Sequence, residues 1–262
     1  MKKNLLLLAA TMTAAGLSAV DDLGMSAEIF RPAEGGELRY RQAVIGADKP
    51  GKSALLLFLH GAGERGNDNI SQLINHFPDI IRFCRKHEMK IVVLAPQCPQ
   101  NEQWVDVPWS AKSHVLPETP SKAMKKVLAL LDAKIPEFDI DRDRIYVTGI
   151  SMGGYGSWDI LSRRPDFFAG ALILCGGADT ACAVRLAHVP IRFFHGKNDT
   201  IVPVSRSRDM AQALHDAGST CFDYRELDCG HFAWNIVYPD ADNFVWLFSQ
   251  TKKPPLAVPE AN

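Results

Sequence analysis

The sequence has no excess of charge of either sign, because 29 lysines and arginines almost balance 30 aspartates and glutamates. A protein with a net charge of −1 has no strong positive field with which to bind nucleic acid or an anionic membrane surface. We therefore expect neither partner, and we expect any ligand to be recognised locally, in a pocket. Hydrophobic residues make up 47% of the 262 positions, which suits one large globular domain.

A metal-binding cysteine pattern is also absent. None of the six cysteines lies in a paired C-x-x-C spacing, so we predict no zinc site, no other metal and no organic cofactor. The first of them is Cys84, which excludes a lipid-modified cysteine after the N-terminal apolar stretch. Cys175 with Cys182, and Cys221 with Cys229, are near enough in sequence to pair, although sequence alone does not give connectivity. We expect most cysteines to be reduced and buried, with at most one bridge.

The N-terminus lacks an apolar run long enough to span a membrane. Lys2 and Lys3 precede an apolar stretch from Leu5 to about Val20, which threonine and serine dilute and two aspartates then end. A basic start, a short apolar segment and small residues near position 19 are typical of a secretory signal peptide. We interpret residues 1–20 as such a signal, and expect an exported protein, periplasmic or secreted, without a stable membrane anchor.

Beyond about residue 37, short apolar runs alternate with segments of helical periodicity. Continuous apolar runs are typical of strands buried on both faces, so this alternation predicts a mostly parallel sheet with helices on both sides. The expected strands are 53–59, 90–95, 144–148, 170–174, 190–194 and 220–227, with 38–45 as an antiparallel edge strand. The expected helices are 69–86, 121–135 (with an N-cap at 119) and 205–217. We predict one α/β domain over residues 30–252, followed by a disordered tail at 253–262.

The segment 149–153 reads Gly-Ile-Ser-Met-Gly and matches the G-x-S-x-G nucleophile elbow, with a predicted strand before it and a predicted helix after it. In such an elbow the serine sits at a sharp turn whose neighbours have no room for a Cβ atom, which explains the two glycines. The turn lifts the hydroxyl above the carboxyl ends of the strands, where open α/β sheets bind ligands. Ser151 is therefore the candidate nucleophile, and a chance glycine-rich turn is the alternative.

A serine hydroxyl needs a base, and the chain order in α/β-hydrolases is serine, acid, histidine. Asp199 follows a predicted strand end, and His231 lies on a glycine-bearing loop after the next predicted strand. Asp179 and Asp228 remain alternatives for the acid, the first because some hydrolases carry it one strand earlier. The other histidines weighed as the base fall on helical segments or come before the acid in the order, and they are His188, His195 and His215.

The oxyanion of a tetrahedral intermediate needs two backbone donors. One belongs to the residue after the nucleophile, here Met152, and the other to a loop after an early strand. The loop after strand 53–59 has the small residues that let amides face a substrate, and Ala62 is the candidate donor there, although an ordinary tight turn would use the same glycines. Trp104 and Trp234 lie on loops near this centre, and are candidates for stacking on a sugar or an aryl acyl group, or for packing beneath the loops.

Three segments carry a resemblance to a known family, and they are 59–66 (LHGAGERG), 95–99 (APQCP) and 149–156 (GISMGGYG). They resemble the phospholipase/carboxylesterase branch of the α/β-hydrolases, within it exported esterases often labelled predicted peptidases, which are similar to feruloyl and acetyl-xylan esterases. The resemblance covers roughly residues 35–250. It implies the α/β-hydrolase fold and, among the residues above, a triad of Ser151, Asp199 and His231 with an oxyanion hole at Ala62 and Met152.

These observations predict a serine carboxylic-ester hydrolase that forms an acyl-enzyme with short-chain or aryl esters, carbohydrate-linked esters included. A serine peptidase is the second hypothesis, although no propeller or capping domain offers a subsite for a peptide terminus. A non-catalytic binding protein on a hydrolase scaffold is the third, and such proteins typically lose the serine, the base or the oxyanion glycines. The sequence leaves the acyl and alcohol specificity and the oligomeric state open.

Overall fold

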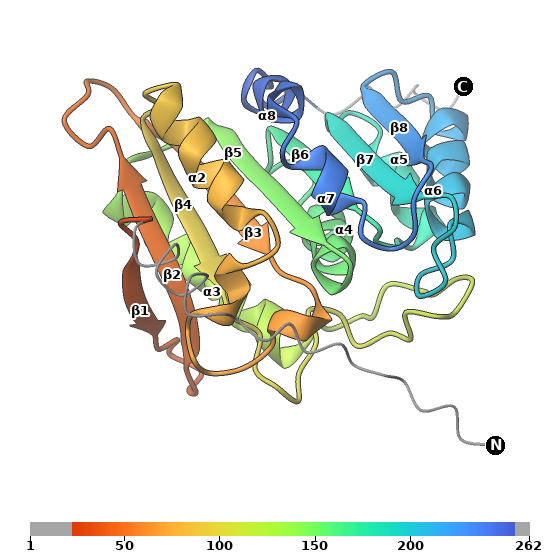
Figure 1. The fold of residues 1–262 in the computed structure, drawn as a ribbon, viewed down its shortest axis with the longest axis horizontal. Helices are drawn as coiled ribbons and strands as arrows, with labels where there is room; N and C mark the ends of the chain where they lie inside the picture. The colour runs from red at the N-terminus through yellow and green to blue at the C-terminus, as the bar shows by residue number, and fades with distance from the viewer. Residues whose placement is uncertain (1–22, 255–262) are drawn as a thin grey trace, which may run out of the picture.

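The computed structural model describes residues 23–254 (Figure 1). The predicted signal peptide at 1–20 lies outside the described residues, as does all but the start of the predicted tail at 253–262. The described residues form an eight-stranded sheet in the order β1-β2-β4-β3-β5-β6-β7-β8. The strands are β1 (Ser26–Phe30), β2 (Leu38–Ile45), β3 (Ser53–Leu59), β4 (Ile91–Pro96), β5 (Ile140–Ile150), β6 (Gly170–Leu174), β7 (Ile191–Gly196) and β8 (Phe222–Leu227).

From β4 across to β8 all neighbouring strands pair in parallel, so the predicted α/β class and mostly parallel sheet are confirmed. β2 pairs antiparallel with β4, as expected, but it is not the edge, because β1 pairs antiparallel with its other side. β1 begins at Ser26, whereas we expected the domain to begin at residue 30. The side chains of this short strand are exposed or half-buried, so its hydrophobic pattern carries little signal.

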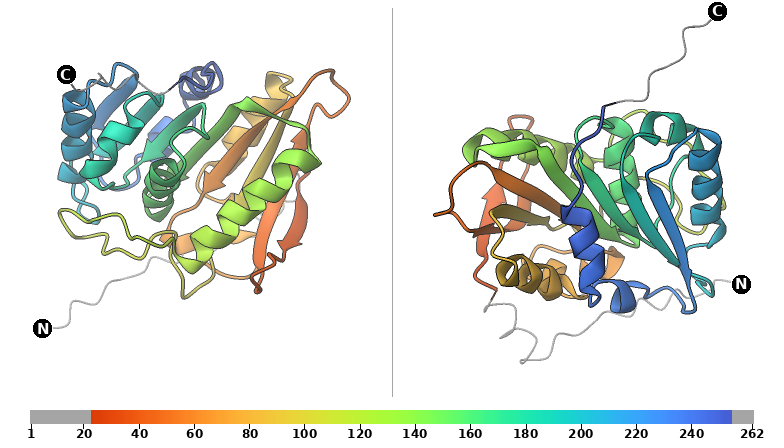
Figure 2. Two further views of the ribbon diagram at one scale, coloured as in Figure 1. Left: turned by 180° about the vertical axis from the view of Figure 1, so that it is seen from behind. Right: turned by 90° about the horizontal axis from the view of Figure 1, so that it is seen from above.

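Helices cover both faces of the sheet. The helices in front of the sheet in Figure 1 are α2 (Phe77–Lys86), α7 (Trp234–Val237) and α8 (Ala241–Phe248). Those on the other face, seen from behind in Figure 2, are α3 (Lys122–Glu137), α4 (Met152–Arg163), α5 (Ala183–Leu186) and α6 (Ser205–Asp216). Short 3₁₀ turns complete the description at η1 (Ala62–Glu64), η2 (Ser71–Leu73) and η3 (Thr180–Cys182).

The two hydrophobic cores lie on opposite faces of the sheet, and β3 contributes to both. Leu55 and Leu57 belong to one core, while Leu56 and Phe58 belong to the other, and all four are fully buried. Because successive side chains of a strand point to opposite faces, a strand covered on both sides must be apolar at every position. This is the physical reason why β3 reads as a continuous apolar run.

The helices differ from prediction mainly at their starts. The segment expected to be helical over 69–86 forms only η2 and then α2, because Asn75 and His76 adopt left-handed backbone conformations with φ of 56° and 65°. The cap of α3 is Ser121 and not the threonine two positions earlier, since its side chain accepts a hydrogen bond from the backbone N–H of Met124 at 3.1 Å. α6 lies within one residue of its predicted range, and Gly218 follows with φ of 76°.

The two candidate disulfides do not form, and all six cysteines are free. The thiol of Cys221 donates to the carbonyl oxygens of Ala187 and Val189 at 3.4 and 3.3 Å. Cys175 and Cys182 are both buried as separate apolar side chains, which is the alternative that the sequence favoured. Among residues 23–254, no helix combines the length and the apolar character needed to cross a bilayer.

Candidate active site

Ser151 stands at the turn between β5 and α4, with an unusual backbone conformation of φ 53° and ψ −116°. Its N–H donates to the carbonyl oxygen of Leu174, at the end of β6, at 2.9 Å. A Cβ atom at Gly149 would overlap the carbonyl group of Gly153, and one at Gly153 would overlap that of Leu59. Close backbone contacts therefore require both glycines of the motif, as the sequence predicted.

The structure brings together the side chains of the predicted nucleophile, base and acid. Nε2 of His231 lies 2.8 Å from Oγ of Ser151, and Nδ1 of the same ring lies 2.6 Å from Oδ2 of Asp199. The three residues follow β5, β8 and β7, whose carboxyl ends share one edge of the sheet. In this arrangement His231 is placed to accept the hydroxyl proton, while Asp199 fixes its tautomer.

Four N–H donors surround the Asp199 carboxylate. The backbone N–H groups of Ile201 and Val202 donate to Oδ1 at 2.8 and 2.9 Å, and Oδ2 faces Nδ1 of His231 and, at 3.2 Å, Nε2 of His195. Burial would raise the pKa of Asp199, but the hydrogen bonds from His195 and His231 hold it well below its usual range. The carboxylate is therefore ionised at neutral pH.

His195 comes too early in the chain order to be the base, and the structure places it behind the acid instead. Its fully buried ring has Nε2 near two oxygens, that of Asp199 and the carbonyl of Val202 at 3.0 Å, so this nitrogen carries the proton. Nδ1 then accepts from the hydroxyl of Ser207 at 2.7 Å. No feature of the sequence indicated this role, because the contacts of the ring with Asp199, Val202 and Ser207 depend on how the loop after β7 folds.

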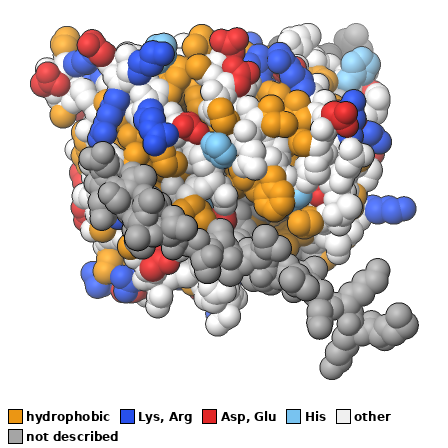
Figure 3. All heavy atoms as spheres, viewed as in Figure 1, with side chains coloured by type: hydrophobic (Ala, Val, Ile, Leu, Met, Phe, Trp, Pro, Cys, Tyr) orange, Lys and Arg blue, Asp and Glu red, His pale blue; other side chains and the backbone are white. Residues whose placement is uncertain are grey.

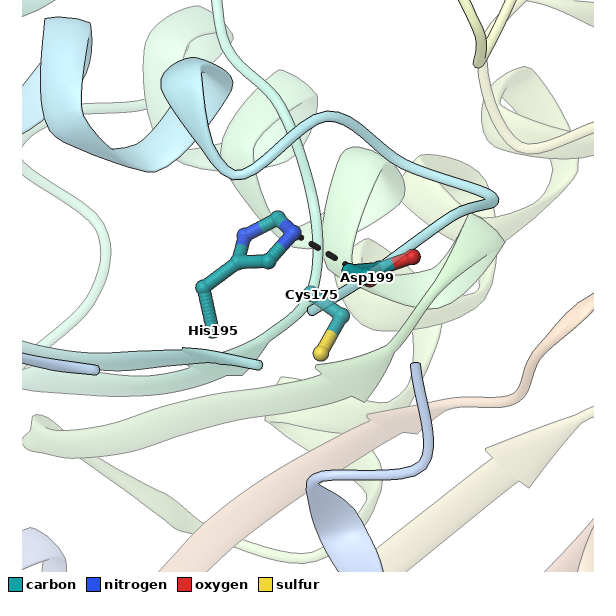
Figure 4. A group of neighbouring side chains, drawn as sticks. All are labelled: Cys175, His195 and Asp199. Atoms are coloured by element: carbon teal, nitrogen blue, oxygen red, sulfur yellow. Dashed lines mark ion pairs between the residues drawn. The ribbon is translucent and has the colours of Figure 1, made fainter. Parts of the chain in front are cut away.

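Figure 4 shows Asp199 and His195 together with Cys175, the group of three potential metal ligands that residues 23–254 bring within 4.8 Å of one another. Burial raises the pKa of the Cys175 thiol to about 12, so it stays protonated at neutral pH. The facing nitrogen of His195 carries a proton, and Asp199 accepts hydrogen bonds from four donors. A protonated thiol and a protonated ring nitrogen are poor ligands for a cation, and the group suits hydrogen bonding to the acid.

The predicted oxyanion donors begin two helices at the same edge of the sheet. Met152 is the first residue of α4, and Ala62 is the first residue of η1, so neither N–H has an intrahelical acceptor. Neither amide donates to any other group between residues 23 and 254. Two free N–H groups of this kind can bind an oxyanion, and the start of α4 adds the positive end of its helix dipole.

His60 fixes the loop that carries Ala62. Its ring is fully buried, with Nδ1 2.6 Å from the carbonyl oxygen of Gly61 and Nε2 accepting from the N–H of Cys98 at 2.9 Å. Burial lowers the pKa of His60 to about 4, so the ring is neutral and can donate and accept at the same time. The segment after β3 is thereby tied to the segment after β4. These segments carry the LHGAGERG and APQCP motifs, but the motifs alone do not show that the two segments are in contact.

Trp104 and Trp234 are not placed to stack on a substrate. Trp104 has no exposed surface, and its Nε1 donates to the carbonyl oxygen of His60 at 3.0 Å, so it packs beneath the oxyanion loop. Trp234 is 3% exposed and lies edge-on to the His231 ring, with 5.2 Å between ring centroids. The exposed aromatic side chain here is Phe232, at 54%, which the sequence analysis missed.

Asp179 and Asp228, the two alternatives for the acid, make their hydrogen bonds to groups other than His231. Asp179 caps η3 by accepting from Ala181, and its other oxygen accepts from the backbone N–H of Leu116 at 2.8 Å. Asp228 has only a 3.5 Å contact with the side-chain amide of Asn198. Neither carboxylate contacts His231, so the hydrogen-bonded acid is Asp199.

Glu64 is a buried carboxyl group beside the oxyanion loop. Oε1 accepts from the side-chain amide of Asn75 at 2.7 Å, while Oε2 has no hydrogen-bond partner within residues 23–254. Burial raises the pKa of Glu64 from 4.5 to about 7, against the lowering effect of the backbone groups of Gly61 and Glu64 and of the Asn75 amide. The neighbouring Arg65 donates to the carbonyl oxygen of Ala62 at 2.9 Å.

We expect Glu64 to make the protein less stable as the pH rises from 4.5 to 7. The folded state holds the Glu64 proton to a higher pH than the unfolded state, so unfolding becomes easier across this interval. Glu64→Gln removes this dependence. Between pH 5 and pH 8.5, the free energy of unfolding of the variant should therefore rise by about 3 kcal/mol relative to that of the wild type. Urea unfolding at the two pH values measures the change, with the exposed Glu34→Gln as control. Parallel pH dependence in wild type and Glu64→Gln would contradict the assignment.

Comparison with known proteins shows which family the chain belongs to. The Phospholipase/Carboxylesterase family matches residues 40–247. The chain belongs to this family. A curated relative, a probable inactive carboxylesterase of Oryza sativa subsp. japonica, is 24% identical over 213 residues, which is 71% of this chain and 86% of the relative. The predicted resemblance to the phospholipase/carboxylesterase branch is therefore confirmed.

Solved structures similar to this family member are esterases and peptidases with the α/β-hydrolase fold. A thermostable esterase superposes with a TM-score of 0.80 and 34% identity over 90% of this chain, which spans 64% of the length of that esterase. A ferulic acid esterase gives a TM-score of 0.63 at 16% identity, covering 84% of this chain and 97% of its own. A dipeptidyl peptidase 4 of Porphyromonas gingivalis gives 0.62 at 14% identity, covering 86% of this chain and 35% of its own. The predicted α/β-hydrolase fold is confirmed.

Removal of the His195 contact should weaken any reaction that depends on Asp199. We expect His195→Phe to lower kcat/KM for an ester by about 10- to 100-fold, the loss associated with one hydrogen bond to a charged group. The acidic limb of the pH profile should move to higher pH, because an Asp199 carboxylate with one donor fewer attracts the protonated ring of His231 more strongly. His195→Gln, which keeps an N–H donor, should restore part of the rate. His188→Phe, at a buried histidine that pairs with Asp166, is the control.

An unshifted pH profile in His195→Phe, together with a wild-type kcat/KM, would show that His195 serves packing alone. Thermal unfolding of both histidine variants identifies any loss of rate that arises from poor folding. Because the control also removes a buried imidazole, a rate loss shared by the two variants would also contradict a role through Asp199.

Proposed function

We propose that this family member is an exported serine carboxylesterase that hydrolyses short-chain or aryl esters through an acyl-enzyme. The observation that carries the proposal is the hydrogen-bonded chain from Ser151 through His231 to Asp199, with the serine raised on a glycine-flanked turn. Export rests on the N-terminal sequence at 1–20. N-terminal sequencing of protein from the periplasm and the medium tests that part, and an uncleaved intracellular chain would contradict it.

The reaction follows from the positions of these atoms. His231 Nε2 accepts the proton of Ser151 as Oγ attacks the ester carbonyl carbon, and Asp199 stabilises the resulting imidazolium. The N–H groups of Met152 and Ala62 bind the oxyanion, each with a contribution of about 3 kcal/mol to the transition state. His231 then protonates the leaving alcohol, and a water molecule, deprotonated by the same ring, releases the acid from the serine.

An exposed hydrophobic surface beside His231 favours an apolar or aryl group on the substrate. Phe232 is 54% exposed, and its ring centroid lies 5.9 Å from that of His231. On α7, five residues after His231, Ile236 is 51% exposed. Figure 3 shows hydrophobic side chains among the charged ones on the face that carries α7 and α8. An aryl ester would bury part of this surface, at about 25 cal/mol for each Å².

Ester and amide substrates compared side by side test the proposed activity. We expect turnover of p-nitrophenyl acetate, p-nitrophenyl butyrate and methyl ferulate, and little or none of a dipeptide p-nitroanilide. Amide hydrolysis with a kcat/KM as high as that for the esters would favour the peptidase alternative. The absence of ester turnover by folded protein would contradict the esterase.

A non-catalytic role is the second candidate, because the relative from rice is named a probable inactive carboxylesterase. In this chain the serine, histidine and aspartate are present and within hydrogen-bonding distance of one another, which supports catalysis. A fluorophosphonate probe reacts only with an activated serine. Labelling of Ser151 would support the enzyme, and unlabelled folded protein would support the binding role.

A further inference from the structure

Arg206 is a buried cation without a carboxylate partner. It lies in the first turn of α6, is 2% exposed and forms no ion pair within residues 23–254, and the carboxylates of Asp209 and Asp179 attract its charge only from a greater distance. Its guanidinium contacts Nδ1 of His114 and the carbonyl oxygens of Ala111 and Ala178, the latter two at 3.5 and 3.4 Å, while Nε has no partner. A guanidinium offers five N–H donors, so this set of acceptors leaves some of them unsatisfied.

The same side chain lines a cavity of about 360 Å³ between the segment 112–114, the segment 178–180 and α6. Lys112 also lines this cavity, and the carboxylates of Asp209 and Asp216 line it along the exposed face of α6. Arg206 is therefore the buried charge of the cavity, and the acidic side chains belong to its exposed part. Charged arginines are almost never fully buried unless they are paired, and the cavity has the space for an anionic partner.

The surroundings of Arg206 are built for a guanidinium group. A Cβ atom at position 177 would overlap its Nε, so Gly177 leaves the space that the group occupies. The Tyr155 ring lies beneath it, with 5.4 Å between the guanidinium carbon and the ring centroid. Burial followed by the charge of Arg206 lowers the pKa of His114 to about 4, so this ring is a neutral acceptor. The first turn of a helix also favours negative charge and disfavours a cation.

The cavity lies at the same edge of the sheet as Ser151. Ala178 belongs to the loop after β6, whose last residue, Leu174, accepts the N–H of Ser151. Tyr155, which lies beneath Arg206, is one helical turn beyond the serine, and its N–H donates to the carbonyl oxygen of Ser151 at 3.1 Å. α6 itself begins just after the loop that carries Asp199.

We propose that this cavity binds a carboxylate, held by Arg206, and that the carboxylate belongs to the ester substrate. The substrates would then include half-esters of dicarboxylic acids and esters of other acidic compounds. This inference rests on the proposed esterase activity for its substrate part, while the anion site rests on the cavity and on the unpaired guanidinium.

The kinetic test compares mono-p-nitrophenyl glutarate, which carries a free carboxylate, with the neutral p-nitrophenyl butyrate, using the full chain. Arg206→Met should lower the ratio of the two kcat/KM values, acidic over neutral, by about ten-fold, as for the loss of one charged hydrogen bond. Arg206→Lys should keep part of the ratio. Arg208→Met is the matched control, because Arg208 lies two residues along α6 and pairs with Glu226 at 2.7 Å on the surface; it should leave the ratio unchanged.

A binding test separates a substrate carboxylate from a free anion. Glutarate is titrated into the full chain at constant ionic strength, and binding is followed by calorimetry and by the increase in Tm. Binding that Arg206→Met abolishes supports the anion site, and an unchanged kinetic ratio beside it would overturn only the substrate assignment. No glutarate binding and an unchanged ratio would overturn the proposal, leaving Arg206 as a clamp between loops. Failure of the wild type to hydrolyse either ester would contradict the esterase activity, and the titration would still test the site.

Discussion

Ser151→Ala is expected to lower kcat for p-nitrophenyl butyrate by about 10⁵- to 10⁶-fold, as for other serine nucleophiles. The reason is that Oγ is both the atom that would form the acyl bond and the hydrogen-bond partner of His231 at 2.8 Å. The oxyanion donors at Ala62 and Met152 are unaffected, so a small residual rate above that of the buffer should remain. The ratio of the two kcat values comes from initial rates at saturating ester, measured with enough enzyme to detect the residual rate.

The appropriate control is Ser26→Ala, an exposed serine on β1 at the far edge of the sheet. It should react with a fluorophosphonate probe as the wild type does, whereas Ser151→Ala should not react. Thermal unfolding must show that Ser151→Ala is folded, and we expect it to be, since alanine removes only the hydroxyl at a position whose backbone is fixed by its neighbours. An undiminished rate in the folded variant would assign the nucleophile to another residue.

The middle of the sheet could be predicted from the sequence because β3, β4 and β6 are apolar at almost every position. β3 and β6 have the predicted bounds, and each is fully buried along its length. β1 escaped prediction because its partly exposed side chains carry no such pattern, and only pairing with β2 makes it a strand. The start of α2 depended on left-handed conformations at Asn75 and His76, which propensity does not reveal.

The site divides in the same way between local and tertiary information. The elbow at Ser151 is visible in the local sequence as a motif, although only Gly149 is required by contacts within the turn, whereas Gly153 is required by the carbonyl group of Leu59 on β3. The contact between His195 and Asp199 also joins residues only four apart in sequence. A histidine and an aspartate at this spacing are common by chance, so the spacing alone does not predict the contact. The burial of Trp104 beneath His60, and of Arg206 above Tyr155, depends on loops that meet only after folding.

Asp199→Asn is expected to lower kcat by about 10⁴-fold, because it presents His231 in the wrong tautomer. In the wild type Oδ2 accepts the proton on Nδ1, which leaves Nε2 free to accept from Ser151. An asparagine cannot satisfy all its neighbours, since Oδ1 already faces the N–H groups of Ile201 and Val202. The amide nitrogen must then face Nδ1, and the ring proton moves to Nε2, opposite the serine.

Asp179→Asn and Asp228→Asn are the matched controls, because both aspartates satisfy the sequence order for the acid but neither contacts His231. Each should keep kcat for a neutral ester within about two-fold of the wild type, as is usual for substitutions away from such contacts. The loss in Asp199→Asn should persist at high pH, where a histidine base is deprotonated in any case, because the error lies in which nitrogen carries the proton. Recovery of the wild-type rate at high pH would instead mean that Asp199 acts only by raising the basicity of the ring, and the positional argument for its role would fail.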